Sequence, residues 1–245
     1  MATRGARGFG QYSGTARALE RVGDRWALLI VRDLLVGPRR YGDLKAGLPR
    51  IPTNILSDRL RELQESGVVR RVPTVRGGYE LTAFGCELEP IVNALERWGW
   101  SALGDPVEGE VVTRDALTAS LRAAFRPDAA AGAPPTEYVL HVGDASVAAV
   151  VSGGRLDVVP IGPDAIPRPR RGEQAEVAFE AGVEFELTSA ELRDLLSGRL
   201  DPAEVRLLTG ERETLERFTR TFRIDPVGPA PDAASESGAA AASVA

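Results

Sequence analysis

The sequence has very few of the side chains that form disulfides and transition-metal sites. Its 245 residues include one cysteine, Cys86, and one histidine, His141. A single cysteine excludes an intramolecular disulfide. One cysteine and one histidine cannot supply the ligands of a structural zinc site, although sites made only of carboxylates stay open. We therefore expect no metal site and no cofactor.

Long apolar stretches are also absent. No window of the sequence approaches the ~18–20 apolar residues that a membrane-spanning helix needs. The first residues, MATRGARGFGQ, lack the apolar run of a secretion signal. These absences predict a cytoplasmic protein without a membrane partner.

Known catalytic motifs are missing as well. The sequence contains no G-x-S-x-G, P-loop, H-E-x-x-H or Rossmann fingerprint. A Ser/His or Cys/His pair would have to include His141, which lies in a predicted strand and is expected to be a hydrogen-bonded structural residue. We expect no enzyme. Catalysis by the carboxylate-rich C-terminal half, as at Glu184 and Glu186, is a remote alternative.

Charge is divided unevenly along the chain. Residues 1–104 have 16 basic and 11 acidic side chains, a net charge of +5, and the remaining 141 residues have 14 and 24, a net of −10. A basic part joined to an acidic part suggests two domains with different partners. The expected order is a disordered segment, a first domain, a linker, a second domain and a disordered tail, over residues 1–11, 12–103, 104–112, 113–225 and 226–245.

The first domain contains the pattern of a helix held on a turn. A helix over 15–35, which Gly23 interrupts, comes first, and another helix begins near residue 83. Between them, the sequence predicts two helices joined by a Pro-containing turn and then two short strands, over 41–47, 53–66, 68–72 and 78–82. A helix held in this way fits the major groove of DNA, and the strands would form a wing beside it.

The helix over 53–66 has one apolar and one polar face. At 100° per residue, Leu56, Leu60 and Leu63 point inward. The opposite face presents four side chains that could contact base edges, namely Thr53, Asn54, Ser57 and Arg61. Asp58 on the same face could pair with Arg61. Such a polar face alone is more typical of a solvated helix.

Arginines around this helix favour DNA binding over the solvated-helix interpretation. Two arginines precede the helix over 41–47, which is the supporting helix of the helix over 53–66. Others lie on the predicted hairpin, where they would meet phosphates or the minor groove. The predicted DNA contacts from these positions are Arg39, Arg40, Arg71 and Arg76.

Residues 12–99 resemble the HxlR family of bacterial winged-helix transcription regulators. The segments ARALERVGDRWALLIVRDLLVGPRRYGDLKAGLP, LSDRLRELQESGVV, YELTAFG and LEPIVNALERWG carry the resemblance, in order and at family-like spacing. The resemblance implies a homodimer on a near-palindromic operator, with the terminal helices of this domain as the interface. It also implies that Trp26 and Trp98 are core or dimer residues.

The sequence departs from the family at one position. Many members have a cysteine just before the first helix, sometimes used for redox sensing, whereas this chain has Ser13. Thiol sensing through that position is therefore not expected. Cys86 is expected to be a small buried residue, and its redox sensing is left open.

The second domain resembles sterol-carrier-protein-type domains. Within residues 116–224, the segment FELTSAELRDLLSGRLDPAEVRLLTGERETLERFTRTF carries this resemblance. Apart from the resemblance, the sequence itself predicts a loop over 127–135, strands over 137–142, 146–151, 155–159, 177–180 and 183–187, and helices after Thr188, after Asp201 and over 211–222. Capping boxes at Thr188 and Asp201 support the first two of these helices. The fold class is therefore α+β throughout.

Two interpretations of the second domain stay open. It could bind a small apolar or lipid-like ligand, with pocket candidates Leu192, Leu196, Leu215 and Phe218. It could instead be only a dimerisation or protein-interaction module with a filled core. We predict a regulator, by default a repressor, that binds double-stranded DNA as a homodimer. The operator, the target genes, the sign of regulation and the ligand are not readable from the sequence.

Overall fold

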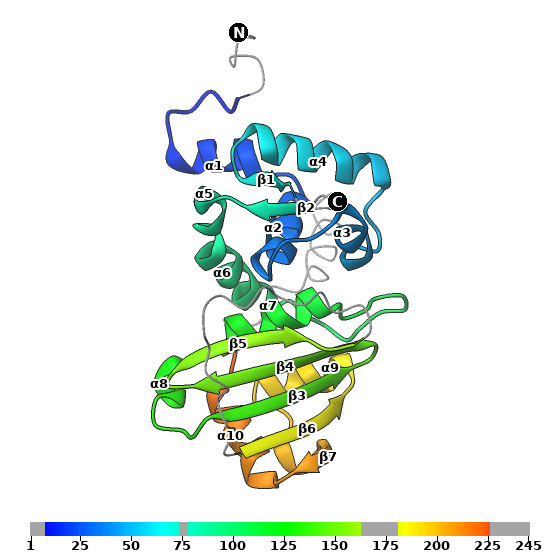
Figure 1. Ribbon diagram of the computed structural model, residues 1–245, viewed down its shortest axis with the longest axis vertical. Helices are drawn as coiled ribbons and strands as arrows, with labels where there is room; N and C mark the ends of the chain where they lie inside the picture. Colours follow the sequence, from blue (N-terminus) through cyan, green and yellow to red (C-terminus); the bar gives the residue numbers. More distant parts are fainter. Residues whose placement is uncertain (1–7, 74–77, 163–180, 226–245) are drawn as a thin grey trace, which may run out of the picture.

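The computed structural model describes residues 8–73, 78–162 and 181–225. These residues form two hydrophobic cores, one in an N-terminal domain that is mostly helical and one in a C-terminal domain built on a sheet. Figure 1 shows the two domains one above the other, with α7 at the junction between them. Among the described residues, no helix is both long and apolar enough to cross a lipid bilayer.

The N-terminal domain has the predicted order of elements. It consists of α1 (Gly14–Val22), α2 (Ala27–Leu35), α3 (Tyr41–Gly47), α4 (Thr53–Glu65), β1 (Val69–Val72), β2 (Gly78–Leu81), α5 (Ala83–Cys86) and α6 (Glu89–Trp100). The predicted break at Gly23 is confirmed. Gly23 is the C-cap residue of α1, and its backbone N–H donates a hydrogen bond to the carbonyl oxygen of Leu19. The helix expected from residue 83 is divided into α5 and α6.

The end of α4 sets the start of the wing. Gly67 has a φ of +76°, which favours glycine, and the N–H of Val68 returns to the carbonyl of Leu63 at 2.9 Å. The chain then enters β1, which pairs antiparallel with β2. An isolated bridge also joins Arg39 to Tyr79, so the backbone of the segment before α3 is hydrogen-bonded to the wing. The predicted hairpin is confirmed, although residues 74–77 at its tip lie outside the described residues.

The C-terminal domain is one sheet with helices on one face. It consists of α7 (Arg114–Ala124), α8 (Pro127–Ala130), β3 (Thr136–Val142), β4 (Ala145–Ser152), β5 (Arg155–Pro160), β6 (Ala181–Leu187), α9 (Ser189–Leu196), η1 (Pro202–Glu204), β7 (Arg206–Gly210) and α10 (Arg212–Thr221). The strand order among the described residues is β5-β4-β3-β6-β7, in which only β3 and β6 run parallel.

Strand alternation decides which face of this sheet is covered. Leu140 and Val142 of β3 are buried, whereas His141 between them is half-buried. The buried face packs on α7, α9 and α10, and the rings of Tyr138, Phe185 and Phe218 meet edge to face at its centre. A mixed sheet with one half-solvated face explains the alternating sequence of its strands.

Two predictions in this domain are wrong. The capping box at Asp201 starts only the single turn η1, after which the chain becomes strand β7, because Val205 is buried and residues 206–210 pair with β6. The expected loop over 127–135 contains the one-turn helix α8. By contrast, the capping box of Thr188 and Glu191 is confirmed at the start of α9. The strand predicted over 177–180 lies outside the described residues.

The close approach of α5 to the wing generates a stability prediction. A Cβ on Gly85 would lie 2.2 Å from the carbonyl oxygen of Val68. Gly85→Ala should therefore lower the free energy of unfolding by about 1–3 kcal/mol or more, because the backbone must move apart. The measurement is the urea unfolding midpoint, taken at an unchanged m-value.

Gly99→Ala in α6 is the matched control for this substitution. A Cβ there meets nothing within 4 Å, so the change should be neutral or stabilise the protein by up to about 1 kcal/mol. Equal midpoints for the two variants would contradict the packing of α5 on the wing.

Candidate nucleic-acid interface

The face of α4 that the sequence predicts as free is free in the structure. Leu56, Leu60 and Leu63 are buried in the N-terminal core. Thr53 and Asn54 are exposed at the first turn of the helix. Figure 1 shows α4 on the side of the N-terminal domain that is farthest from the sheet of the C-terminal domain. The helix can therefore approach a large partner without obstruction from the second domain.

Tyr41 positions the first turn of α4, a role that was not predicted. Its hydroxyl donates to the carbonyl oxygen of Thr53 at 2.7 Å, and the Ser57 hydroxyl donates to the same oxygen at 3.1 Å. The Ser57 hydroxyl also lies 3.3 Å from that of Tyr41. These bonds connect α3 to α4 and orient the predicted contact residues. The only signal in the sequence was the position of Tyr41 at the start of the supporting helix.

Arg61 lies on the same face one turn later. Its Nη2 donates to Asp58 Oδ1 at 2.9 Å, which confirms the predicted pair. Its Nε lies 4.0 Å from Glu65 Oε1. The Arg61 side chain is 65% exposed. Exposed ion pairs of this kind contribute little to stability, so a phosphate or a guanine edge can compete for the guanidinium.

Two of the flanking arginines are exposed beside α4. Arg40 lies at the N-terminus of α3, where its backbone N–H is held by Asp43 Oδ2 at 2.8 Å and its side chain extends into solvent. Arg71 of β1 stacks on the ring of Tyr79 at 5.4 Å and donates to its hydroxyl at 3.2 Å. Arg76 lies outside the described residues.

Arg39 differs from the other predicted contacts. Its Nη2 donates to Asp115 Oδ1 of α7 at 2.6 Å and its Nε to Oδ2 at 3.3 Å. Both side chains are only 10% exposed. The structure therefore places Arg39 at the junction of the two domains. Its partner is 76 residues later in the chain, and no local pattern in the sequence indicates the pairing.

A second buried carboxylate lies beside this pair. Asp33 Oδ1 accepts from Nε and Nη2 of Arg32 at 2.9 and 2.8 Å, and Asp33 Oδ2 has no hydrogen-bond partner among the described residues. A Cβ on Gly47 would lie 2.8 Å from Asp33 Oδ2 and 3.5 Å from Asp115 Oδ2, so only glycine leaves room there. We call Arg32, Asp33, Arg39 and Asp115 the junction cluster.

Burial has a direct electrostatic consequence in the junction cluster. Loss of hydration raises the pKa of Asp33 from its ordinary value to about 7, and Arg32 opposes this shift only in part. The negative charge of Asp115 adds to the increase in the pKa. Asp33 is therefore protonated over much of the mildly acidic range.

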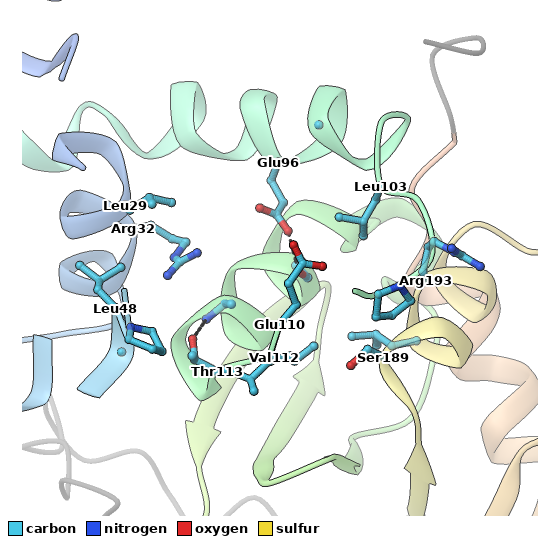
Figure 2. Close-up of a pocket in the computed structure, with 18 of the residues that line it drawn as sticks. Leu29, Arg32, Leu48, Glu96, Leu103, Glu110, Val112, Thr113, Ser189 and Arg193 are labelled. Carbon is cyan, nitrogen blue, oxygen red and sulfur yellow. Dashed lines mark hydrogen bonds between the residues drawn. The ribbon is translucent and has the colours of Figure 1, made fainter. Parts of the chain in front are cut away.

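The junction also contains a pocket of about 560 Å³. Figure 2 shows it between α2, α6, α7 and α9, with Leu29, Glu96, Glu110 and Val112 directed into it. Of the four predicted ligand-pocket residues, only Leu192 lines this space. The other three are fully buried in the C-terminal core, namely Leu196, Leu215 and Phe218. Trp26 also lines the pocket.

The single histidine and the single cysteine of the sequence lie in different environments. His141 is hydrogen-bonded through Nδ1 to Ser146 Oγ at 2.8 Å and through Nε2 to Glu184 Oε1 at 2.9 Å, which confirms its predicted structural role. Cys86 is exposed, so the prediction of a buried thiol is wrong, because α5 turns it outward. Within the described ranges there is no group of three or more His, Cys, Asp or Glu side chains that could hold a metal ion.

The raised pKa of Asp33 predicts a pH dependence of stability. The folded-state pKa of about 7 lies above the ordinary value of 3.8, so folding takes up a proton between these values. The free energy of unfolding should therefore fall as the pH rises from about 4 to about 7 and then level off. Asp33→Asn should reduce this fall, which urea unfolding at about pH 5 and about pH 8 would measure.

The exposed Asp144 offers the matched control. Asp144→Asn should keep the pH dependence of the parent protein. An Asp33→Asn variant with the same pH dependence as the parent would show that Asp33 is not the titrating group.

Known proteins resemble the N-terminal domain. A family model described as HxlR-like helix-turn-helix matches residues 21–105. An uncharacterized HTH-type transcriptional regulator of Mycobacterium tuberculosis is 45% identical over 94 residues, which cover 37% of this chain and 59% of that protein. The HTH-type transcriptional regulator YvaP of Bacillus subtilis is 40% identical over 86 residues, which cover 34% of this chain and 80% of YvaP.

Solved structures also resemble this part of the chain. The redox regulator HypR in its reduced form is 32% identical, with a TM-score of 0.34, over 36% of this chain and 92% of that one. The family match ends at residue 105 and so does not include the C-terminal sheet. Because the match to YvaP covers most of that regulator, the chain belongs to the HxlR-like helix-turn-helix family.

Proposed function

We propose that the protein is a cytoplasmic transcription regulator that binds double-stranded DNA through its N-terminal domain and acts as a repressor. The observation that carries this proposal is the geometry of α4. Its apolar side is fixed in the core, and its polar side presents Thr53, Asn54 and Ser57 beside the exposed Arg40 and Arg71. Polar groups at the first turns can meet base edges, while flanking arginines neutralise phosphates.

A homodimer is the second part of the proposal. Ile91 and Trp98 of α6 are exposed at 48% and 68%, and Leu19 of α1 and Phe84 of α5 are exposed as well. Figure 1 shows α1, α5 and α6 along the same side of the N-terminal domain. Large apolar side chains exposed together mark an interaction surface. A second copy of the chain on this side would place two α4 helices for the two halves of a near-palindromic operator.

The C-terminal domain is proposed to have a sterol-carrier-protein-type fold. The support is its mixed sheet with helices on one face and its final amphipathic helix α10. A ligand within its core would have to displace side chains such as Leu196, Leu215 and Phe218, which are fully buried. This filled core favours the alternative in which the domain itself serves as an interaction module, and the effector binds elsewhere.

The DNA-binding proposal predicts two different effects of losing an arginine. Arg61→Ala should cost about 1–3 kcal/mol on a preferred duplex and reduce discrimination against other sequences, because it reads a base. Arg40→Ala should weaken binding equally on all sequences and lower the salt slope by about one, because it meets a phosphate. Anisotropy titrations on a duplex selected from random DNA, and on its scrambled form, would measure both effects at several salt concentrations.

Arg155→Ala is the control, since it removes an exposed arginine from β5 of the C-terminal domain. It should leave affinity and salt slope unchanged. If the Arg61 and Arg40 variants also bind like the parent, α4 does not occupy the groove. If no sequence is enriched from random DNA, the proposal of a sequence-specific regulator fails.

The dimer proposal predicts that a charge on α6 separates the protomers. Trp98→Glu should shift the protein from dimer to monomer, because it places a carboxylate in an apolar interface. Operator affinity should fall with it, since one α4 helix reads only half of the site. Sedimentation equilibrium would measure the mass. Val107→Glu, at an apolar residue that is 61% exposed in the linker, is the control. A Trp98→Glu variant that stays dimeric would place the interface elsewhere.

A further inference from the structure

The pocket at the junction has the size and composition of a small-molecule site. Its volume of about 560 Å³ lies within the range of ligand pockets in proteins. Both domains and the linker contribute apolar walls, which include Trp26, Leu29, Trp100, Leu103, Val112 and Leu192. Two aromatic rings in a mostly apolar space suit a ligand with a ring system.

The charged groups of this pocket favour one sign of ligand. Glu96 accepts a hydrogen bond from Ser120 Oγ at 2.6 Å, and Glu110 accepts one from the N–H of Val107 at 3.2 Å. Figure 2 shows the two carboxylates entering the space from α6 and from the linker and pointing toward each other. Neither has an ion-pair partner in the part of the chain that the structure describes.

The basic side chains of the lining are mostly neutralised. Arg32 is paired with Asp33, and Arg193 is paired with Asp194 and Asp105 at 2.9 Å each. Figure 2 shows the guanidinium of Arg193 directed away from the two glutamates. Arg50 is exposed, and its Nη2 lies 3.4 Å from the carbonyl oxygen of Gly109. Glu110 is exposed like Arg50, and the two offset each other. Above about pH 7, where Asp33 is ionised and neutralises Arg32, the uncompensated charge inside the pocket is therefore the negative charge of Glu96.

A buried donor in the wall adds a second feature. The indole Nε1 of Trp100 is buried and has no hydrogen-bond acceptor among the described residues. A buried donor left without an acceptor costs free energy. Because Nε1 is buried, Trp100 offers a molecule in the pocket its aromatic ring and not this donor.

We propose that this pocket binds a lipophilic organic cation, whose charge is met by Glu96 and Glu110 and whose ring system packs between Trp26 and Trp100. Carboxylates and aromatic faces are the groups that attract an organic cation in an apolar site. A site of this kind is distinct from the interior of the C-terminal sheet domain, where the core is filled.

The position of the pocket connects the ligand to DNA binding. Thr113, the N-cap residue of α7, and Ala116 within α7 line it, and between them lies Asp115, which holds Arg39 beside the wing. A molecule in the pocket contacts α2 and α6 on one side and α7 and α9 on the other. The domains could be arranged in one way that binds DNA and in another that does not. A molecule in the pocket changes DNA affinity if it binds these two arrangements with different affinities. This last step rests on the proposed function, whereas the binding site does not.

The binding test compares two ions of the same shape and opposite charge, using the full chain without DNA. Tetraphenylphosphonium should change the tryptophan fluorescence saturably, because Trp26 and Trp100 line the pocket, and tetraphenylborate should not. Replacing both carboxylates, with Glu96→Gln and Glu110→Gln, should weaken phosphonium binding by about tenfold or more. Isothermal titration calorimetry would give the same ranking.

Matched variants make the binding test decisive. Glu87→Gln removes an exposed carboxylate outside the pocket and should leave binding unchanged. Ala116→Trp fills the space and should abolish binding of the phosphonium ion. Equal or tighter binding of the borate ion, or unchanged phosphonium binding in the double glutamine variant, would overturn the proposal.

A separate titration tests the coupling to DNA. Tetraphenylphosphonium should change the affinity of the parent protein for its selected duplex, and it should not change that of the double glutamine variant. Phosphonium binding without any change in DNA affinity would support the site and overturn the coupling. A protein that binds the phosphonium ion but no DNA would overturn the proposed function and support the site.

Discussion

The buried ion pair between Arg39 and Asp115 connects the two domains, and much of the structure depends on it. The backbone of Arg39 bridges Tyr79 in the wing, while its side chain is held by α7. Removing either partner would leave an uncompensated charge in a site with little solvent, which is strongly unfavourable. The wing, the supporting helix and the second domain are thereby attached at one residue. Asp33 and Arg32 extend this network into the core of the first domain.

Helix α6 has three roles because its side chains point in three directions. Val92 packs in the N-terminal core, whereas Trp100 at its end belongs to the core of the C-terminal domain. Ile91 and Trp98 are exposed on the side proposed for the dimer. Glu96 faces α7 and the junction pocket. The proposed ligand, the proposed second protomer and the domain junction would therefore all contact the same helix, so a shift of α6 at one of them would reach the others.

The separation of charge along the chain has a spatial meaning. The C-terminal part, with a net charge of −10, would repel DNA if it lay beside the reading helix. Figure 1 shows α4 at the far end of the N-terminal domain from the acidic sheet domain. The positively charged domain can thus meet phosphates while the acidic domain stays at a distance. Within the junction, opposite charges instead meet at short range, as at Arg39 and Asp115.

The sequence by itself determined the features that depend on local periodicity and capping. The inward face of Leu56, Leu60 and Leu63, the stop at Gly67 and the cap at Thr188 follow from interactions between residues a few positions apart. Only the tertiary structure decided that residues 206–210 form β7, because that strand exists through hydrogen bonds offered by β6. It also decided the partner of Arg39 and the pocket of Glu96 and Glu110, since these bring together side chains from distant segments, and no local pattern encodes their meeting.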